Sequence, residues 1–334
     1  MTRTTQRIGR GAFPRRQSGL SLVELLVALT LGLVAVGGAV SIYLANRQSF
    51  VMVEAVARVE EGARFAVELL ARDIREAGNS PCGGAMTSTN LVTTPAAPHW
   101  ATWERGLLGN ALSDTDVPGT SIAGPTDASA RDPGSDSLLV WSASAGNSPV
   151  RITAHTPGAT GAFTTATEHG YGAGDVVVAC DGRQLLTFEV QSPSGTSVAY
   201  SGGAAVKPML PNGMLNPLTT HLWYVGGSKE VGGARALRRI TIDKSGAMLA
   251  NDEMITGVAK MQIKYLVGDA ATGVPDPAAI YQSAGAALSW SSVIAVQIAL
   301  TLSSIEKINR AGSTPEVYFH TVPLTVAVRR RLQP

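Results

Sequence analysis

Glu24 has the most unusual chemical setting in this chain, because its carboxylate lies inside a long apolar run. Residues 20–45 read LSLVELLVALTLGLVAVGGAVSIYLA, and Glu24 is the only charged side chain among them. A bare carboxylate in hydrocarbon costs a few kcal/mol, so it needs a partner or a function. The chemistry open to it is an ion pair in dry surroundings, in which two opposite charges neutralise each other.

Other residues that do chemistry in proteins are scattered along the sequence. None of the five histidines stands in an HExxH or other metal-ligand pair, and no GxSxG motif provides a serine nucleophile. The glycines of HGYGAGD at 169–175 predict a turn rather than a phosphate loop, because a strand-like run follows them. We therefore predict no enzyme, no cofactor and no assigned metal site. Calcium binding stays undecided for four loop aspartates that lack the EF-hand spacing, Asp114, Asp116, Asp132 and Asp136.

The apolar run is long enough to cross a membrane. About 25 residues at 1.5 Å each span ~38 Å, against ~30 Å for the hydrocarbon core. Residues 1–19 hold five arginines and no acid, so we expect a cytoplasmic amino terminus and a periplasmic remainder. A secretory signal peptide has a shorter apolar stretch that ends at a small-residue cleavage site. Hydropathy alone leaves a plain signal anchor as an alternative.

The residues Gly19-Leu20-Ser21-Leu22-Val23-Glu24 resemble the processing site of type IV prepilins. The resemblance implies that a prepilin peptidase cuts after Gly19, and that Leu20 becomes the N-methylated new amino terminus. It also implies that the Glu24 carboxylate pairs with the α-ammonium of a neighbouring subunit during assembly. The alternative is an isolated glutamate at the membrane edge. Leu20 departs from the phenylalanine that is commonest there, and the helix lacks the proline that kinks many major pilins.

The helical period continues beyond the membrane run. Three acid-before-base pairs at i, i+4 indicate solvated faces: Glu54–Arg58, Glu60–Arg64 and Glu68–Arg72. An apolar stripe follows another face, formed by Val53, Val56, Val59, Ala63, Val67, Leu70, Ile74 and Ala77. The stop signal at 78–81 predicts one helix over 20–78, with a transmembrane or filament-core segment at 20–45 and an amphipathic continuation at 46–78. A coiled-coil dimer competes with this interpretation, but the stripe lacks leucine-rich heptads.

Residues 79–334 predict a periplasmic, β-rich globular domain. After a loop-rich stretch at 82–135, eight β-type runs occur at 138–144, 175–180, 185–191, 221–225, 236–242, 260–267, 293–302 and 316–328. The runs at 221–225 and 236–242 suggest a hairpin, and residues 250–259 suggest a short helix. The predicted fold class is α+β, with one long amino-terminal helix packed on an antiparallel sheet.

Charge and cysteine usage limit the partners. The net charge of +2 becomes −3 without residues 1–19, so we expect no nucleic-acid partner. Charged residues are 16% of the chain and hydrophobic residues 45%, a composition that excludes full disorder. The two cysteines, Cys82 and Cys180, both fall in the oxidising periplasm, where a two-cysteine domain usually forms a disulfide. Two buried thiols are the alternative.

Several sequence segments outside the leader resemble the PilW group of minor pilins. The resemblance rests on ELLARDIREAGNSPCG at 68–83, GDVVVACD at 174–181, ITGVAKMQIKYLVGD at 255–269, WSSVIAVQIALTLSS at 290–304 and the terminal TVPLTVAVRRRL. It implies a structural subunit that primes or caps a type IV pilus, first in the inner membrane and then in the pilus. Its implied partners are prepilin peptidase, other minor pilins, the major pilin and inner-membrane lipid. A J-type minor pseudopilin of type II secretion and a membrane-anchored periplasmic enzyme or binding protein are the alternatives.

Overall fold

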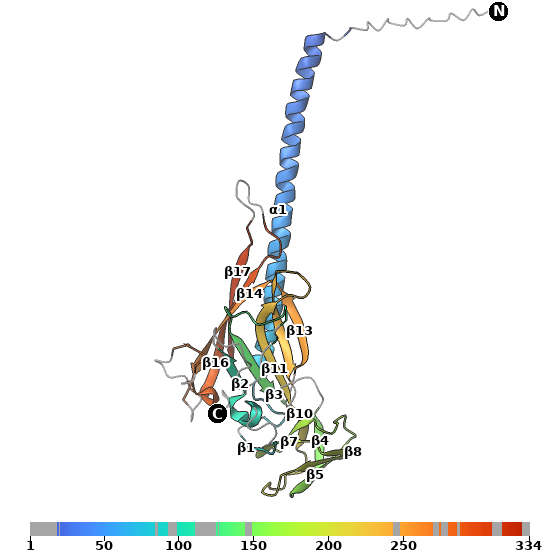
Figure 1. Cartoon of the computed structure of the whole chain (residues 1–334), viewed down its shortest axis with the longest axis vertical. Coiled ribbons are helices and arrows are strands. Elements are labelled where there is room, and N and C mark those ends of the chain that lie inside the picture. Colours follow the sequence, from blue (N-terminus) through green and yellow to red (C-terminus); the bar gives the residue numbers. More distant parts are fainter. Residues whose placement is uncertain are drawn as a thin grey trace, which may run out of the picture.

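The computed structural model describes residues 19, 21–83, 86–92, 99–110, 125, 127–143, 149–242, 248–269, 274, 280–285, 288–308 and 316–328. One long helix, α1, projects from a β-sheet domain that lies along its carboxyl-terminal half (Figure 1). The predicted α+β class, with a long amino-terminal helix on antiparallel sheet, is confirmed.

Helix α1 is unbroken over Leu22–Glu76, 55 residues, or about 80 Å at 1.5 Å per residue. The Ser21 hydroxyl caps its start by accepting the backbone N–H of Glu24 at 3.2 Å. The helix ends before Gly78, whose φ of 67° is left-handed and free of strain only for glycine. The predicted range of 20–78 therefore differs from the observed helix only at its ends.

Two antiparallel sheets lie against α1. One has the strand order β13-β12-β11-β3-β2, and the other has the order β15-β14-β16-β17. Strand β13 continues into β14 through Gly257, where φ is 85° and an added Cβ would lie 2.8 Å from the Ser303 carbonyl oxygen. The strands of these two sheets are β2 (Leu107–Asn110), β3 (Ser137–Ser142), β11 (Thr219–Gly227), β12 (Arg235–Ile242), β13 (Met248–Thr256), β14 (Val258–Val267), β15 (Gln282–Ser283), β16 (Val293–Ser303) and β17 (Phe319–Ala327).

The core between α1 and these sheets is built on one helix face. Its six buried helix residues are Val59, Ala63, Ala66, Leu70, Ala71 and Ile74. They join a cluster that includes Val296, Ile298 and Leu300 of β16. Each fully buried Leu- or Ile-sized side chain contributes about 1.5–3 kcal/mol, so this face holds the helix on the sheet. The predicted apolar stripe is buried at Val59, Ala63, Leu70, Ile74 and Ala77 and partly buried at Val67, whereas Val53 is 67% exposed.

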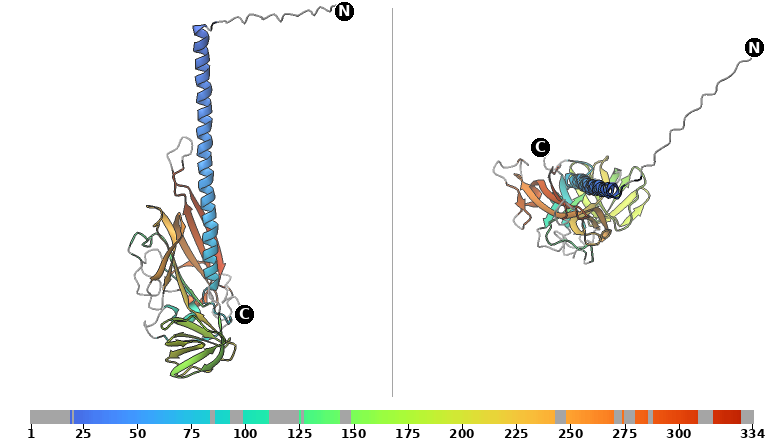
Figure 2. Two further views of the ribbon diagram at one scale, coloured as in Figure 1. Left: turned by 90° about the vertical axis from the view of Figure 1, so that its right-hand side faces the viewer. Right: turned by 90° about the horizontal axis from the view of Figure 1, so that it is seen from above.

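A third sheet forms the end of the domain farthest from the amino terminus of α1 (Figures 1 and 2). Its order is β1-β7-β6-β10-β4-β5-β9-β8, and only the β1–β7 pair is parallel among the pairs described. Its core centres on Phe163, Phe188 and Tyr200, whose ring centroids lie 5.2–5.4 Å apart. We call this the distal sheet; its strands are β1 (Thr87–Asn90), β4 (Val150–Thr156), β5 (Thr160–Thr165), β6 (Val176–Cys180), β7 (Gln184–Glu189), β8 (Ser192–Ser194), β9 (Ser197–Ser201) and β10 (Met214–Pro217).

Three short 3-10 helices complete the described elements: η1 (His99–Ala101), η2 (Trp103–Arg105) and η3 (Trp290–Ser292). All eight predicted strands are present with shifted ends, and the predicted hairpin joins β11 to β12. The predicted short helix at 250–259 is wrong, because these residues form the end of β13 and the start of β14. Pairing with β12 overrides their local preference, and the buried Arg238 donates to Glu253 Oε2 across the two strands at 3.0 Å.

Candidate assembly and processing site

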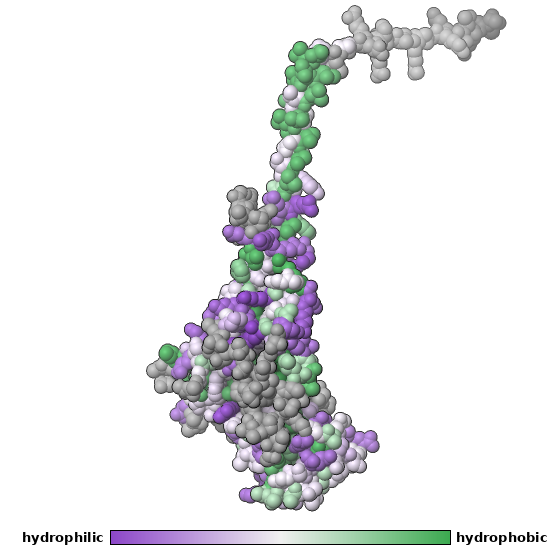
Figure 3. Space-filling model, in the orientation of Figure 1, coloured by the Kyte–Doolittle hydropathy of each residue, from purple (hydrophilic) through white to green (hydrophobic). Residues whose placement is uncertain are grey.

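The amino-terminal half of α1 has an apolar surface that nothing in the described part of the chain covers. Every described residue from Leu22 to Val51 is exposed, and Leu33 and Phe50 are 77% and 70% exposed. Figure 3 shows this half as a largely hydrophobic stem above the domain. A helix that is apolar on all sides belongs in a membrane or among other helices. Length and composition also make α1 able to cross a membrane.

Glu24 lies in the first turn of this stem. Its carboxylate is exposed, and no cation of the described residues pairs with it. The partial positive charge of the helix start favours a carboxylate there. Apart from its chain neighbours, nothing among the described residues lies within 4 Å of the position that a Cβ on Gly19 would take. Leu20 lies outside the described residues.

Asp73 fixes the other half of α1 to β11. Its Oδ2 accepts the Trp223 Nε1–H at 2.8 Å and the His221 Nδ1–H at 2.9 Å. These donors are two residues apart on β11 and therefore point to the same side of the strand. The Asp73 side chain is only 14% exposed, so the two donors replace its lost water. The sequence around Asp73 predicts no such role, because both partners lie far along the chain.

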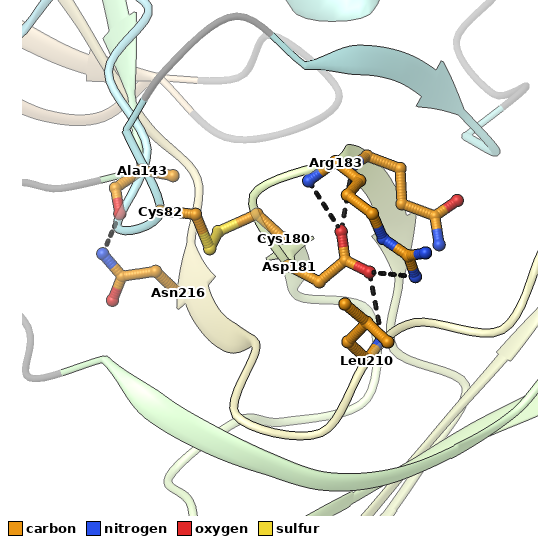
Figure 4. The surroundings of a disulfide bond; sticks show 8 residues. Cys82, Ala143, Cys180, Asp181, Arg183, Leu210 and Asn216 are labelled. Atoms are coloured by element: carbon orange, nitrogen blue, oxygen red, sulfur yellow. Dashed lines mark hydrogen bonds and ion pairs between the residues drawn. A yellow bond between two sulfur atoms is a disulfide. The ribbon is translucent and has the colours of Figure 1, made fainter.

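A disulfide joins Cys82, shortly after α1, to Cys180 at the end of β6 (Figure 4). The two cysteines are 98 positions apart, and closing such a loop stabilises a fold by up to about 4–5 kcal/mol in the chain-entropy model. Beside the disulfide, the buried Asn216 side chain donates a hydrogen bond to the Ala143 carbonyl. The end of the helix is thus covalently attached to the distal sheet.

The other candidate residues serve local structure. Among the described residues, no three His, Cys, Asp or Glu side chains are grouped to hold a metal. Asp132 pairs with Arg235 at 2.8 Å, and Asp136 accepts the backbone N–H of Ile263 at 2.7 Å. Burial raises the pKa of Asp136. The segment 169–175 leads into β6 without a helix, as its interpretation as a turn requires. Two of the four aspartates lie outside the described residues, Asp114 and Asp116.

The fold and the bare apolar stem define a pilin-like layout. The model of the prokaryotic N-terminal methylation motif matches residues 14–40, which include Gly19, Leu20 and Glu24. The model of type IV pilus-assembly protein W, PilW, matches residues 223–332. Together with the fold, these matches support a PilW-like type IV minor pilin with a structural role in pilus assembly.

The two matches cover different parts of the fold. The first spans the start of α1, and the second runs from within β11 through β17, which leaves out β2 and β3 of the two sheets that lie against α1. All eight strands of the distal sheet lie between the two matched ranges. Comparisons with curated proteins and with solved structures found no match. Anchoring in a membrane and location in a pilus fit the apolar helix and the methylation motif.

Proposed function

We propose that this chain is a minor pilin that primes or caps type IV pilus assembly after prepilin peptidase removes residues 1–19. One observation carries the proposal: the bare apolar half of α1 holds a single acid, Glu24, just after the open Gly19. Cutting before the apolar run removes the basic leader and keeps the whole helix. The product is an anchored subunit that can leave the membrane only into another apolar environment, such as the centre of a filament.

The proposed topology places the amino terminus in the cytoplasm and residues 79–334 in the periplasm. Two observations support it. The five arginines of residues 1–19 precede the apolar run, and positive charge is retained in the cytoplasm. The Cys82–Cys180 disulfide is typical of an oxidising compartment. The subunit is then held in the inner membrane until it enters the pilus.

In the proposed assembly step, Glu24 pairs with the α-ammonium of a neighbouring subunit. Cleavage after Gly19 creates that ammonium on Leu20, beside the start of the helix. Two opposite charges that enter a dry filament together cost much less than either one alone. Only a subunit whose ammonium lies level with Glu24 satisfies both charges. The pair would therefore fix the axial register between neighbouring helices.

The distal sheet supports a position at the pilus end. It extends the domain beyond the end of α1, on the side away from the amino terminus (Figure 1). A subunit repeated along a shaft must fit neighbours both above and below, whereas a terminal subunit leaves its distal surface free. The added sheet suits the terminal position. The proposed partners are therefore other minor pilins, the major pilin, and prepilin peptidase before assembly.

Mass spectrometry of the mature amino terminus tests the proposal. We expect a chain that begins at N-methylated Leu20, and a Gly19→Arg variant that keeps its leader. Glu24→Ala should enter the membrane but be lost from purified pili, whereas the control Glu60→Ala, at an exposed acid of the sheet-bound half of α1, should be incorporated normally. A leader that stays attached would return the chain to a plain membrane anchor with a periplasmic domain. Deletion that blocks secretion and leaves pili intact would assign it to type II secretion.

A further inference from the structure

Two hollows that share Arg58 follow one another along α1 where the helix enters the domain, and together they form a lengthwise groove. Helix residues between Val51 and Glu68 form one wall. The end of β13 and the segment Leu302–Glu306, at and after the end of β16, form the other wall. Seventeen helical steps at 1.5 Å each give the groove a length of about 26 Å. A lengthwise groove of this kind fits a rod-shaped partner that lies parallel to α1.

The upper part of the groove is a small hollow. Its volume is about 110 Å³, and its apolar lining comes from Val51, Ala55, Val59, Leu302 and Ile305. Ile305 is 50% exposed although it sits at the edge of this lining. A cavity of about 150 Å³ holds benzene, so this hollow takes one aliphatic side chain. The Glu54–Arg58 ion pair, 2.6 Å long, lies beside it on the helix.

The lower part of the groove is a wider, open depression of about 510 Å³. Phe65 of α1 is 50% exposed there, beside Met254 and Ile255 of β13. Gly62 lets the sheet approach closely, because an added Cβ would lie 3.4 Å from the Ile255 side chain. Acids and bases alternate along the helix wall, so neither sign dominates: Arg58, Glu61, Arg64 and Glu68.

We infer that this groove binds the apolar half of α1 from a neighbouring pilin subunit, an inference that rests on the proposed function. The groove begins at Val51, about 9 Å beyond the end of the apolar run at residue 45, so a helix that lies along the stem continues directly into the groove. The centre of the hollow and Phe65 lie about 15 Å apart along α1, nearly three helical turns. Side chains eleven positions apart on one face of a docked helix reach both points.

A lipid acyl chain fits the same groove less well. The hollow starts six residues, or about 9 Å, beyond the end of the apolar run at residue 45. That distance places it outside the hydrocarbon while the subunit is in the membrane. Four acids and two bases line the groove, so its charges give no general attraction to anionic headgroups. An apolar helix of a neighbouring subunit needs neither surrounding hydrocarbon nor a basic surface. It can therefore occupy the groove once the subunit has left the membrane.

Site-specific photocrosslinking in the full chain tests the inference. A benzophenone amino acid replaces Ile305 in cells that assemble pili, and mass spectrometry maps the attached peptide. We expect attachment to the apolar amino-terminal helix of a pilin subunit. The matched control carries the probe at Ile280, which is 72% exposed and does not line the groove. Attachment to lipid alone, to a partner's globular domain, or to nothing in purified pili would overturn the inference.

A substitution pair adds a quantitative test. Ile305→Glu should lower incorporation into pili about tenfold relative to Ile280→Glu, the effect of roughly 1.4 kcal/mol of contact energy. Both side chains are exposed, so both variants should keep the Cys82–Cys180 disulfide and the fluorescence of the buried tryptophans. Equal incorporation of the two variants contradicts the groove. A correctly cleaved chain that enters pili without the expected crosslink refutes the groove alone, whereas an uncleaved chain absent from pili refutes the proposed function.

Discussion

The two halves of α1 continue one helix but present different surfaces. The half from Leu22 to Val51 is exposed on every side. The half from Val59 to Ile74 buries one face against the sheets and exposes charged residues on the others. Both halves have the same helical backbone, but only the second half packs against other parts of the chain. The bare half needs an apolar partner from outside the chain, whereas the apolar face of the other half packs against the sheets of the same chain.

The glycines of the two halves of α1 differ in the same way, because only one half has close neighbours. In the sheet-bound half, an added Cβ at Gly62 would lie 3.4 and 3.5 Å from side chains of Ile255 and Leu302. In the bare half, Gly32, Gly37 and Gly38 have nothing within 4 Å. Glycine costs about 1 kcal/mol in a helix interior, and close approach of another helix is what compensates for it in a membrane or bundle. The uncovered glycines thus mark a second contact face that the isolated chain leaves unused.

The largest effect should come from a matched pair of leucines in the two halves. Leu70 is fully buried, whereas Leu31 is 65% exposed. Leu70→Ala should lower the free energy of unfolding by about 4 kcal/mol, because it leaves a cavity between helix and sheet. Leu31→Ala should change it by less than about 0.5 kcal/mol. Urea unfolding of the full chain in detergent, followed by tryptophan fluorescence, measures both. Equal losses would show that the stem also supports the domain.

The next effect concerns the covalent link at the end of the sheet-bound half. Replacing both cysteines, Cys82→Ser with Cys180→Ser, should lower the free energy of unfolding by about 3 kcal/mol, somewhat less than the chain-entropy limit. The distal sheet should loosen first, because it lies at one end of the link. Hydrogen exchange of β6 and of α1 measures the difference. Reduced wild-type protein is the control. If neither the double variant nor the reduced protein shows a lower urea midpoint of unfolding than the oxidised wild type, the disulfide has no stabilising role.

Much of this architecture follows from strong periodic signals in the sequence. The ends of α1 are predictable because Ser21 caps one end and Gly78 stops the other. Strands such as β16, where every second residue is buried, show a clear two-residue period. The Glu54–Arg58 pair forms at 2.6 Å. The other two predicted pairs, Glu60–Arg64 and Glu68–Arg72, form no ion pair within the described helix, because exposed pairs gain little in water.

Of the distal sheet, the sequence predicts only β6 and β7, because the other strands carry little apolar signal. Strand β5 reads TGAFTT, and Phe163 is its only large apolar residue. Strand β8 has three residues, none of them buried. The sequence predicts a helix over 250–259 because the polar residues of β13 have no two-residue period, and only the pairing with β12 makes this segment a strand. The Asp73 contact also has no local signal, because its partners are about 150 positions away.

Asp73 offers a smaller test of what holds the sheet-bound half. Asp73→Ala leaves the Trp223 and His221 N–H donors without their acceptor, which should cost about 2 kcal/mol of unfolding free energy. Glu54→Ala is the control on the same helix, because it removes an exposed ion pair worth at most about 0.5 kcal/mol. Urea unfolding and the near-ultraviolet dichroism of tryptophan measure both variants. Equal stabilities would show that core packing alone holds the helix.

The smallest expected effect concerns a histidine in the distal sheet, far from both halves of α1. His155 Nδ1 accepts the backbone N–H of Met209 at 3.0 Å, so its Nε2–H donates to Tyr200 Oη at 2.6 Å. Burial lowers the pKa of His155, and the Asp181 carboxylate opposes this only in part. The bond pattern and the lowered pKa agree, because a proton on Nδ1 would face the Met209 N–H and remove that hydrogen bond.

Acid should therefore loosen the distal sheet and leave the helix contact unchanged. Because the folded pKa of His155 lies below its ordinary value of 6.5, its contribution is complete above about pH 6.5 and is lost as the pH falls through the folded pKa. We expect a loss of at most about 1 kcal/mol between pH 7.5 and pH 5. Hydrogen exchange should accelerate at the Met209 amide but not at Leu70. His155→Gln supplies a neutral acceptor and should remove the pH dependence. If the two amides respond to acid alike, the distal sheet and the helix contact unfold as one unit.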